Sequence, residues 1–150
     1  MSHYYAIPLF DETALASVMH AAGADFSRLV GYFGDDGARC IGQIEQAHDA
    51  ADAAALVDPA CRLEEQARQM GARRLSLIAG EIEQTARRCL EQQEPPGTIA
   101  HEISMLRVCF SQTLALLCEV APGRAPPPAP RARLSAPSVR PRIFGRRPMA

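Results

Sequence analysis

The chain has 150 residues, of which 47% are hydrophobic and 5% aromatic, with no Trp. This length suffices for one domain with a sizeable core, and the scarcity of aromatic side chains favours a helical bundle built on Ala and Leu. The formal net charge of −1 is unevenly spread, because residues 121–150 hold seven Arg and no acid whereas the preceding residues hold nine Arg and seventeen acids. An acidic body of this kind argues against a domain that binds nucleic acid through its folded surface.

The ends of the chain and its cysteines favour a cytoplasmic protein without membrane association. The N-terminus MSHYYAIPLF has neither a basic start nor a long apolar run, and we expect no segment to approach the roughly 18 apolar residues of a membrane span. The cysteines are odd in number and include no C-x-x-C pair, which indicates reduced thiols rather than disulfides or a zinc site. We expect no cofactor. They are Cys40, Cys61, Cys89, Cys109 and Cys118.

The first half of the chain predicts a short helix followed by a long one. Asp11 is a candidate N-cap for a helix over about 12–21, and Gly23 is a candidate stop. Asp25 is a candidate N-cap for a second helix that extends to about residue 47. Its apolar stripe is interrupted by several glycines, so we expect fraying near Gly34 to Gly37.

The second half predicts three more helices. Asp52 is placed to cap a helix over about 53–70, which contains Pro59 and is therefore expected to kink locally. Gly71 separates it from a helix over about 73–93. The turn Pro95-Pro96-Gly97 then leads to Thr98, a candidate N-cap for a last helix that ends near Val120.

The predicted fold class is all-α. Four amphipathic helices joined by short connections bury their apolar stripes most simply as an antiparallel four-helix bundle, here preceded by the short first helix. We expect an N-terminal arm over residues 1–9, the bundle over 10–120, and a disordered tail over 121–150 that is rich in Pro and Arg. Within the tail, Arg124 to Pro130 fits the basic-x-x-P-x-x-P pattern of polyproline II ligands.

One stretch of the 53–70 helix carries an unexpected thiol. Its apolar residues are spaced four and three apart and form a core stripe, namely Leu56, Ala60, Leu63, Ala67 and Met70. On the same helical wheel Cys61 falls on the outward face, with Glu64 and Arg68 beside it and Glu65 further round. A cysteine placed among charged residues on a solvent face requires an explanation.

The order of residues from Ala60 to Ala72, A-C-R-L-E-E-Q-A-R-Q-M-G-A, resembles the signature of histidine phosphotransfer (Hpt) domains, A-H-x-L-K-G-x-A-x-x-L-G-A. The structural positions match, with Met70 in place of Leu. The chemical positions differ, since Cys61 stands where the phosphorylated His is expected, Glu64 where a Lys is expected and Glu65 where a Gly is expected. The resemblance implies a four-helix phosphorelay domain that lacks its phosphoacceptor.

Phosphoryl transfer through such a domain needs an imidazole, a cation for the phosphate and a small residue that allows close approach. None is present at the expected positions, and neighbouring glutamates raise the pKa of a thiol, which disfavours Cys61 as an acceptor. We therefore expect a monomeric, non-enzymatic protein that binds a receiver domain or a histidine kinase through Val57, Cys61, Glu64, Glu65 and Arg68.

Two alternatives stay open from the sequence. A phosphoryl group could be carried by a different histidine, the candidates being His20, His48 and His101. The arginines of the tail could instead bind nucleic acid or another acidic partner through non-specific charge contacts, although the acidic body makes this the weaker interpretation.

Overall fold

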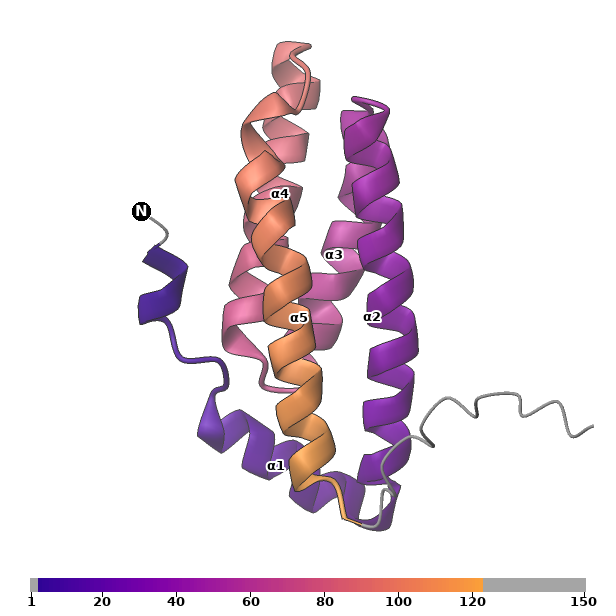
Figure 1. Ribbon diagram of the computed structural model, residues 1–150, viewed down its shortest axis with the longest axis vertical. Helices are drawn as coiled ribbons and strands as arrows, with labels where there is room; N and C mark the ends of the chain where they lie inside the picture. Colours follow the sequence, from indigo (N-terminus) through magenta and orange to yellow (C-terminus); the bar gives the residue numbers. More distant parts are fainter. Residues whose placement is uncertain (1–2, 123–150) are drawn as a thin grey trace, which may run out of the picture.

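The computed structural model describes residues 3–122, and every regular element in that part of the chain is helical (Figure 1). The α-helices are α1 (Glu12–Ala22), α2 (Phe26–Asp49), α3 (Ala53–Gln69), α4 (Arg73–Gln92) and α5 (Ala100–Val120). Three short 3₁₀ turns cover His3–Ala6, Gly23–Asp25 and Gly97–Ile99. The predicted all-α bundle is confirmed, while the predicted disordered tail falls almost entirely on residues 123–150, outside the described part.

The four long helices run alternately up and down, and α1 lies across the end of the bundle at which α5 finishes (Figure 1). α3 packs between α2 and α4, and α5 closes the bundle by packing on α2 and α4. The core is formed by the predicted apolar stripes. Its largest fully buried side chains include Phe26, Ile44, Leu56, Leu63, Leu75, Ile78, Ile82, Leu106 and Leu117.

Two of the predicted helix starts and two of the predicted stops are confirmed. The carboxylate of Asp11 accepts a hydrogen bond from the Ala14 amide, and that of Asp52 accepts one from the Ala55 amide, both at 3.1 Å. Gly23 follows α1 with a φ of 52°, and Gly71 follows α3 with a φ of 73°, a conformation that favours glycine. Gly71 also accepts a hydrogen bond from the Asp11 amide at 2.8 Å, which ties α1 to the α3–α4 corner.

The other two predicted N-caps are wrong. Asp25 ends a 3₁₀ turn with helical backbone angles (φ −82°, ψ −4°), and its side chain makes no capping hydrogen bond to α2. Thr98 lies inside the turn Gly97–Ile99, so α5 begins at Ala100 without a side-chain cap. An N-cap side chain reaches the free amides when its backbone is extended, and these continuous helical turns exclude that geometry.

Gly37 of α2 allows the Phe110 ring of α5 to pack closely against the helix backbone. The helix is continuous from Phe26 to Asp49, without a break at Gly34 to Gly37 where fraying was expected. A Cβ built on Gly37 would lie 2.3 Å from Cε2 of Phe110, so only a glycine lets the α5 aromatic ring approach this closely. α3 is likewise continuous through the buried Pro59, and the local kink expected there stays a prediction.

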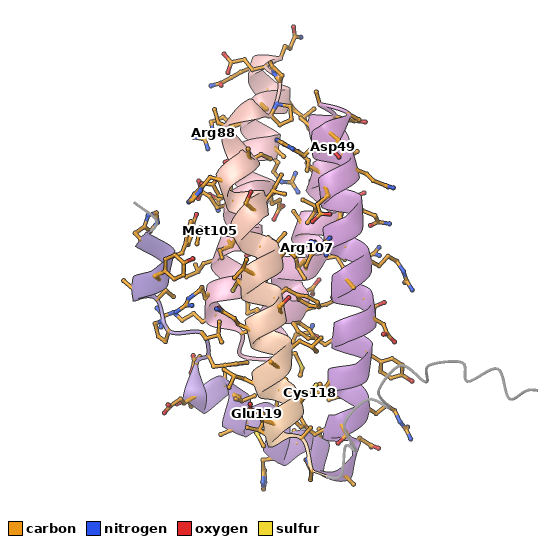
Figure 2. All side chains as sticks on the ribbon, in the orientation of Figure 1. Asp49, Arg88, Met105, Arg107, Cys118 and Glu119 are labelled. Carbon is orange, nitrogen blue, oxygen red and sulfur yellow. The ribbon has the colours of Figure 1, made fainter. Side chains whose placement is uncertain are left out.

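α5 is joined to α2 by an ion pair as well as by the core. Arg107 reaches from α5 toward α2 (Figure 2), and its Nε and Nη2 atoms donate to the two carboxylate oxygens of Glu45 at 2.8 and 2.7 Å. This bidentate contact lowers the pKa of Glu45. It lies at the surface, so it fixes the orientation of α5 more than it stabilises the fold.

Contrary to the expectation from sequence, one stretch of the described chain, Gly97–Val120, is long and apolar enough to cross a membrane. Length and composition alone are weak evidence, because core helices of soluble proteins pass the same test. Here the stretch includes Arg107, and its inner side contributes Leu106, Phe110 and Leu117 to the core of the bundle.

The described residues of the N-terminal arm lie against the bundle. Tyr4 is buried, and the guanidinium of Arg74 in α4 donates from Nε to the Ile7 carbonyl oxygen at 2.8 Å. The same guanidinium lies 5.9 Å from the ring centroid of Tyr5. Arg74 therefore holds the arm along the side of α4 that faces away from α3.

Candidate functional site

The five residues predicted as a binding surface lie together on the outer side of α3. Val57, Cys61, Glu64 and Arg68 form one stripe because they are spaced four, three and four residues apart. Cys61, Glu65 and Arg68 are exposed, whereas Val57 is partly buried against the core. The predicted placement of Cys61 on the outer face of a helix agrees with the structure.

Glu64 turns away from solvent toward α4. Its side chain is only 22% exposed, it pairs with Arg68 one turn further along α3, and it packs against Gly80 of α4. A Cβ on Gly80 would lie 3.2 Å from Cδ of Glu64. The carboxyl group therefore fills the seam between the two helices and does not project beside Cys61 as a free charge.

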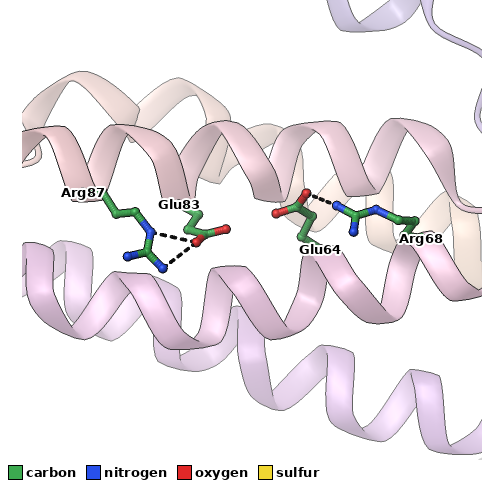
Figure 3. Close-up of polar contacts among 4 residues, drawn as sticks. All are labelled: Glu64, Arg68, Glu83 and Arg87. Atoms are coloured by element: carbon green, nitrogen blue, oxygen red, sulfur yellow. Dashed lines mark hydrogen bonds and ion pairs between the residues drawn. The ribbon is translucent and has the colours of Figure 1, made fainter.

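Two further residues of the site come from α4, and reasoning from the sequence missed them. Glu83 lies across the seam from Glu64, and Arg87 donates to Glu83 from Nε at 2.8 Å. Figure 3 shows the four side chains as a row along the seam, in the order Arg87, Glu83, Glu64, Arg68. The spacing of four residues between Glu83 and Arg87 indicates an ion pair within one helix. The proximity of Glu83 to Glu64, however, depends on how α4 packs on α3 and cannot be seen in the spacing.

The electrostatics of this row raise the pKa of Glu64 and of the neighbouring Cys61 thiol. The pKa of Glu64 is raised mainly by burial and, to a smaller extent, by hydrogen bonding with Glu83, whereas Arg68 lowers it. Partial desolvation, Glu83 and Glu64 together raise the pKa of the Cys61 thiol, against the influence of Arg87. Cys61 is therefore a protonated thiol at neutral pH, which is the poorly nucleophilic form.

The alternative acceptors lie on other helices. His20 is exposed in the last turn of α1, His48 is partly buried in the last turn of α2, and His101 is exposed in the first turn of α5. The structure brings none of these three to the α3 stripe. Within residues 3–122, no group of three or more His, Cys, Asp or Glu side chains is arranged to hold a metal ion.

The remaining cysteines serve the core. Cys40, Cys89 and Cys109 are buried and Cys118 is half-buried, and all five cysteines are free thiols in the described structure. Burial raises the pKa of Cys40 and of Cys109, as is typical of unreactive structural thiols. Cys61 differs from the other four by its exposure.

Comparisons with known proteins agree with this architecture. The Hpt domain family model matches residues 28–118, well over half of the chain. The crystal structure of histidine-containing phosphotransfer protein B (HptB) from Pseudomonas aeruginosa PAO1 superposes with a TM-score of 0.67 at 25% sequence identity, covering 75% of this chain and 94% of that chain. No curated protein sequence matches the chain significantly. The match of the family model over residues 28–118, together with the shared four-helix bundle, shows that the chain belongs to the Hpt domain family of phosphorelay signalling.

Proposed function

We propose that this protein is a non-phosphorylatable Hpt protein, which regulates a phosphorelay by binding a receiver domain or a histidine kinase. The observation that carries the proposal is the substitution of Cys61 at the acceptor position together with its electrostatic surroundings. Slight desolvation of the exposed thiol, together with Glu83 and Glu64, raises the pKa of Cys61, and no imidazole lies on the α3 stripe. Such a protein acts by occupying a partner, without catalysis or a bound cofactor.

Phosphoryl transfer from a receiver requires the acceptor atom to approach an aspartyl phosphate, whose oxygens surround the reacting phosphorus with negative charge. A cation next to the acceptor would offset this charge. Here the two arginines nearest the seam, Arg68 and Arg87, are already paired with Glu64 and Glu83. The net effect of the row on an incoming phosphate is therefore small, and the thiol lacks the activation that transfer needs.

The binding surface consists of the α3 stripe and the neighbouring Glu65, whose charge is decisive. Among the ion pairs of the described residues Glu65 takes part in none, whereas Glu64 is compensated by Arg68. In the usual Hpt pose a residue at this position faces the carboxylates by which a receiver holds its metal ion, and like charges juxtaposed at an interface cost several kcal/mol. The true partner therefore presents Arg or Lys opposite Glu65.

The proposal also specifies the oligomeric state, the compartment and the class of partner. The protein acts as a monomer in the cytoplasm, where receivers and the signalling domains of histidine kinases are found. Nucleic acid is not its partner, because the described bundle carries more acids than arginines.

The proposal is tested by binding and by phosphotransfer. Calorimetric titration with the receiver and kinase domains of the source cell should identify a partner whose affinity falls at least tenfold in the double variant E64K/E65G. The control E91K/E94G makes the same two changes on exposed residues near the end of α4 and should leave the affinity unchanged. In parallel, incubation with phosphorylated receivers should leave no acid-labile phosphate on the protein, and phosphohistidine at His20, His48 or His101 would overturn the proposal.

A further inference from the structure

A second surface feature lies on the seam between α2 and α3, near the end of the bundle at which α5 finishes. It is a shallow groove of about 170 Å³ whose walls include Leu29, Tyr32 and Asp36 from α2 and Gln66 and Gln69 from α3. Leu29 and Tyr32 are 37% and 62% exposed, and they give the groove an apolar wall one turn of α2 in length.

The groove also contains an unused hydrogen-bond acceptor. The Oε1 atom of Gln66 is buried and accepts no hydrogen bond from any residue in the described part of the chain. A buried acceptor without a donor costs about 1–3 kcal/mol, so a ligand with N–H groups gains if a rotation of the Gln66 side chain brings this oxygen to the groove surface. Tyr32 adds an exposed hydroxyl and an aromatic face, and Asp36 adds a carboxylate. The groove thus offers an aromatic platform with acceptors beside it.

The described part of the chain ends close to the first turn of α2, the helix that forms one wall of the groove. Ala121 is buried, and the hydroxyl of Ser27 in the first turn of α2 donates to the Pro122 carbonyl oxygen at 2.7 Å. The chain therefore leaves the described part beside the first turn of the helix that carries Leu29 and Tyr32. The groove lies round the exposed side of α2 from this point.

Residues 123–150 are rich in proline and arginine, and these residue types complement the aromatic ring and the carboxylate that line the groove. Residues 123–150 hold seven Arg and no acid, and their first part reads Arg124-Ala-Pro-Pro-Pro-Ala-Pro130. Proline-rich segments in the polyproline II conformation bind aromatic grooves at low entropic cost, and flanking arginines pair with carboxylates beside such grooves. Prolines lack an N–H, but Ala125, Ala129 and the arginine side chains supply donors for Gln66 and Asp36.

The distances allow this segment to reach the groove without strain. From Ser27 to Asp36 is nine residues of helix, or roughly 13 Å along the axis at about 1.5 Å per residue. The eight residues that follow Pro122, as far as Pro130, span roughly 25 Å in the polyproline II conformation at about 3.1 Å each, so the segment can cross the exposed side of α2 and enter the groove with its last residues. An intramolecular ligand also benefits from an effective concentration in the millimolar range, so weak contacts suffice.

We propose that the segment Arg124 to Pro130 of this same chain docks on the groove formed by Leu29, Tyr32, Asp36, Gln66 and Gln69. The tail is then an internal ligand of the bundle. Gln69 lies one turn beyond Glu65 on α3, so the docked segment flanks the surface assigned to partner binding. This last consequence, a tail that competes with the partner, rests on the proposed function, whereas the docking itself does not.

The docking is tested by NMR on the full chain in the absence of any partner. Amide and side-chain resonances of Leu29, Tyr32, Gln66 and Gln69 should shift between the wild type and a variant in which Pro126, Pro127, Pro128 and Pro130 are all replaced by Ser. Resonances of Val108 and Leu116, which are exposed on the outer side of α5, should not move and serve as the reference. Tyr32→Ala should change the resonances of residues 124–130, whereas Tyr5→Ala, an equally exposed tyrosine in the N-terminal arm, should not.

The possible outcomes separate the occupants of the groove. Shifts that are independent of protein concentration support the intramolecular contact. Shifts that grow with concentration, together with a doubled mass in sedimentation, would assign the groove to the tail of a second copy and overturn the proposal. Groove resonances that are identical in wild type and Pro variant would overturn it as well. None of these readings depends on whether a receiver binds Cys61 and Glu65.

Discussion

The carboxyl group of Glu64 in α3 lies directly against Gly80 of α4, so that a Cβ on Gly80 would stand 3.2 Å from Cδ and 3.3 Å from Oε1 of Glu64. The absence of a side chain at Gly80 provides the space in which Glu64 leaves the solvent and meets Glu83. An interhelical pair of carboxyl groups at this point of an Hpt bundle places negative charge where the resemblance predicts a phosphate-binding cation.

Gly80→Ala should move Glu64 without damaging the fold. The flexible end of a glutamate can yield the few tenths of an ångström that a methyl group needs, and replacing a mid-helix glycine favours α4 by up to about 1 kcal/mol. We expect the free energy of unfolding to stay level or rise, and the pKa of Glu64 to fall because its burial is reduced. Urea denaturation and NMR titration of the Glu64 side chain measure the two effects. A loss of more than about 1 kcal/mol would show that the seam is too rigid to accept a methyl group.

The carboxyl pair should give the stability of the bundle a defined pH dependence. Because the folded state raises the pKa of Glu64, its contribution to stability is present below the ordinary value of 4.5 and is lost as the pH rises through the folded pKa. Glu64→Gln removes this loss, so the unfolding free energy of the variant, measured by urea denaturation, should improve relative to wild type as the pH rises above 4.5.

Removing the charge of Glu83 tests what causes the raised pKa of Glu64. Glu83→Gln removes a negative charge that faces Glu64, and the pKa of Glu64 should therefore fall, as measured by NMR titration. The pKa of the Cys61 thiol should fall too, because Glu83 contributes to its rise, and thiol reactivity against pH reports this. An unchanged Glu64 titration in Glu83→Gln would mean that burial alone holds the proton.

Reasoning from sequence predicted the bundle well because its signals are local. The apolar stripe through Leu56, Ala60 and Leu63 and the caps Asp11 and Asp52 act within one helix, so periodicity and spacing are sufficient. Thr98 and Asp25 were misjudged because a 3₁₀ turn adds one more helical turn before the α-helix and removes the extended backbone that a cap requires.

Reasoning from sequence identified the site residues on α3 but missed those on α4. Cys61, Glu65 and Arg68 share a face of α3, and their spacing alone places them there. Glu83, Arg87 and Gly80 belong to α4, and their approach to Glu64 depends on the rotation of α4 about its own axis, which a hydrophobic stripe defines too coarsely. Gly37 shows the same limit, since its low helix propensity was visible in the sequence but the Phe110 ring against it was not.

A pair of glycine substitutions in α2 should have opposite effects. Gly37→Ala would place a Cβ 2.3 Å from the Phe110 ring, which must move, so we expect a destabilisation of about 1–3 kcal/mol. Gly42→Ala meets nothing within 4 Å and should stabilise by roughly 0.5–1 kcal/mol through helix propensity. Urea denaturation of the two variants measures both, and a stabilised Gly37→Ala would contradict the close packing of α5 on α2.

The last prediction concerns what would restore phosphoryl transfer. Cys61→His alone supplies an imidazole on the exposed face of α3 but leaves Glu64 and Glu83 in the seam and Glu65 in the path of a receiver. We expect this single variant to accept little phosphate, because Arg68 and Arg87 are already paired with Glu64 and Glu83 and therefore do not offset the charge of the phosphoryl group. The triple variant C61H/E64K/E65G adds a cation and removes the obstruction, so it should accumulate acid-labile phosphate from a phosphorylated receiver at a rate at least a hundredfold higher, about 2.7 kcal/mol in activation free energy. The matched variant C61Q/E64K/E65G, which has an amide in place of the imidazole, provides the control for phosphate on other residues. Equal labelling of the single and triple variants would show that Arg87 or Arg68 can leave its glutamate and serve as the phosphate-binding cation, in which case the loss of the histidine alone silenced the domain.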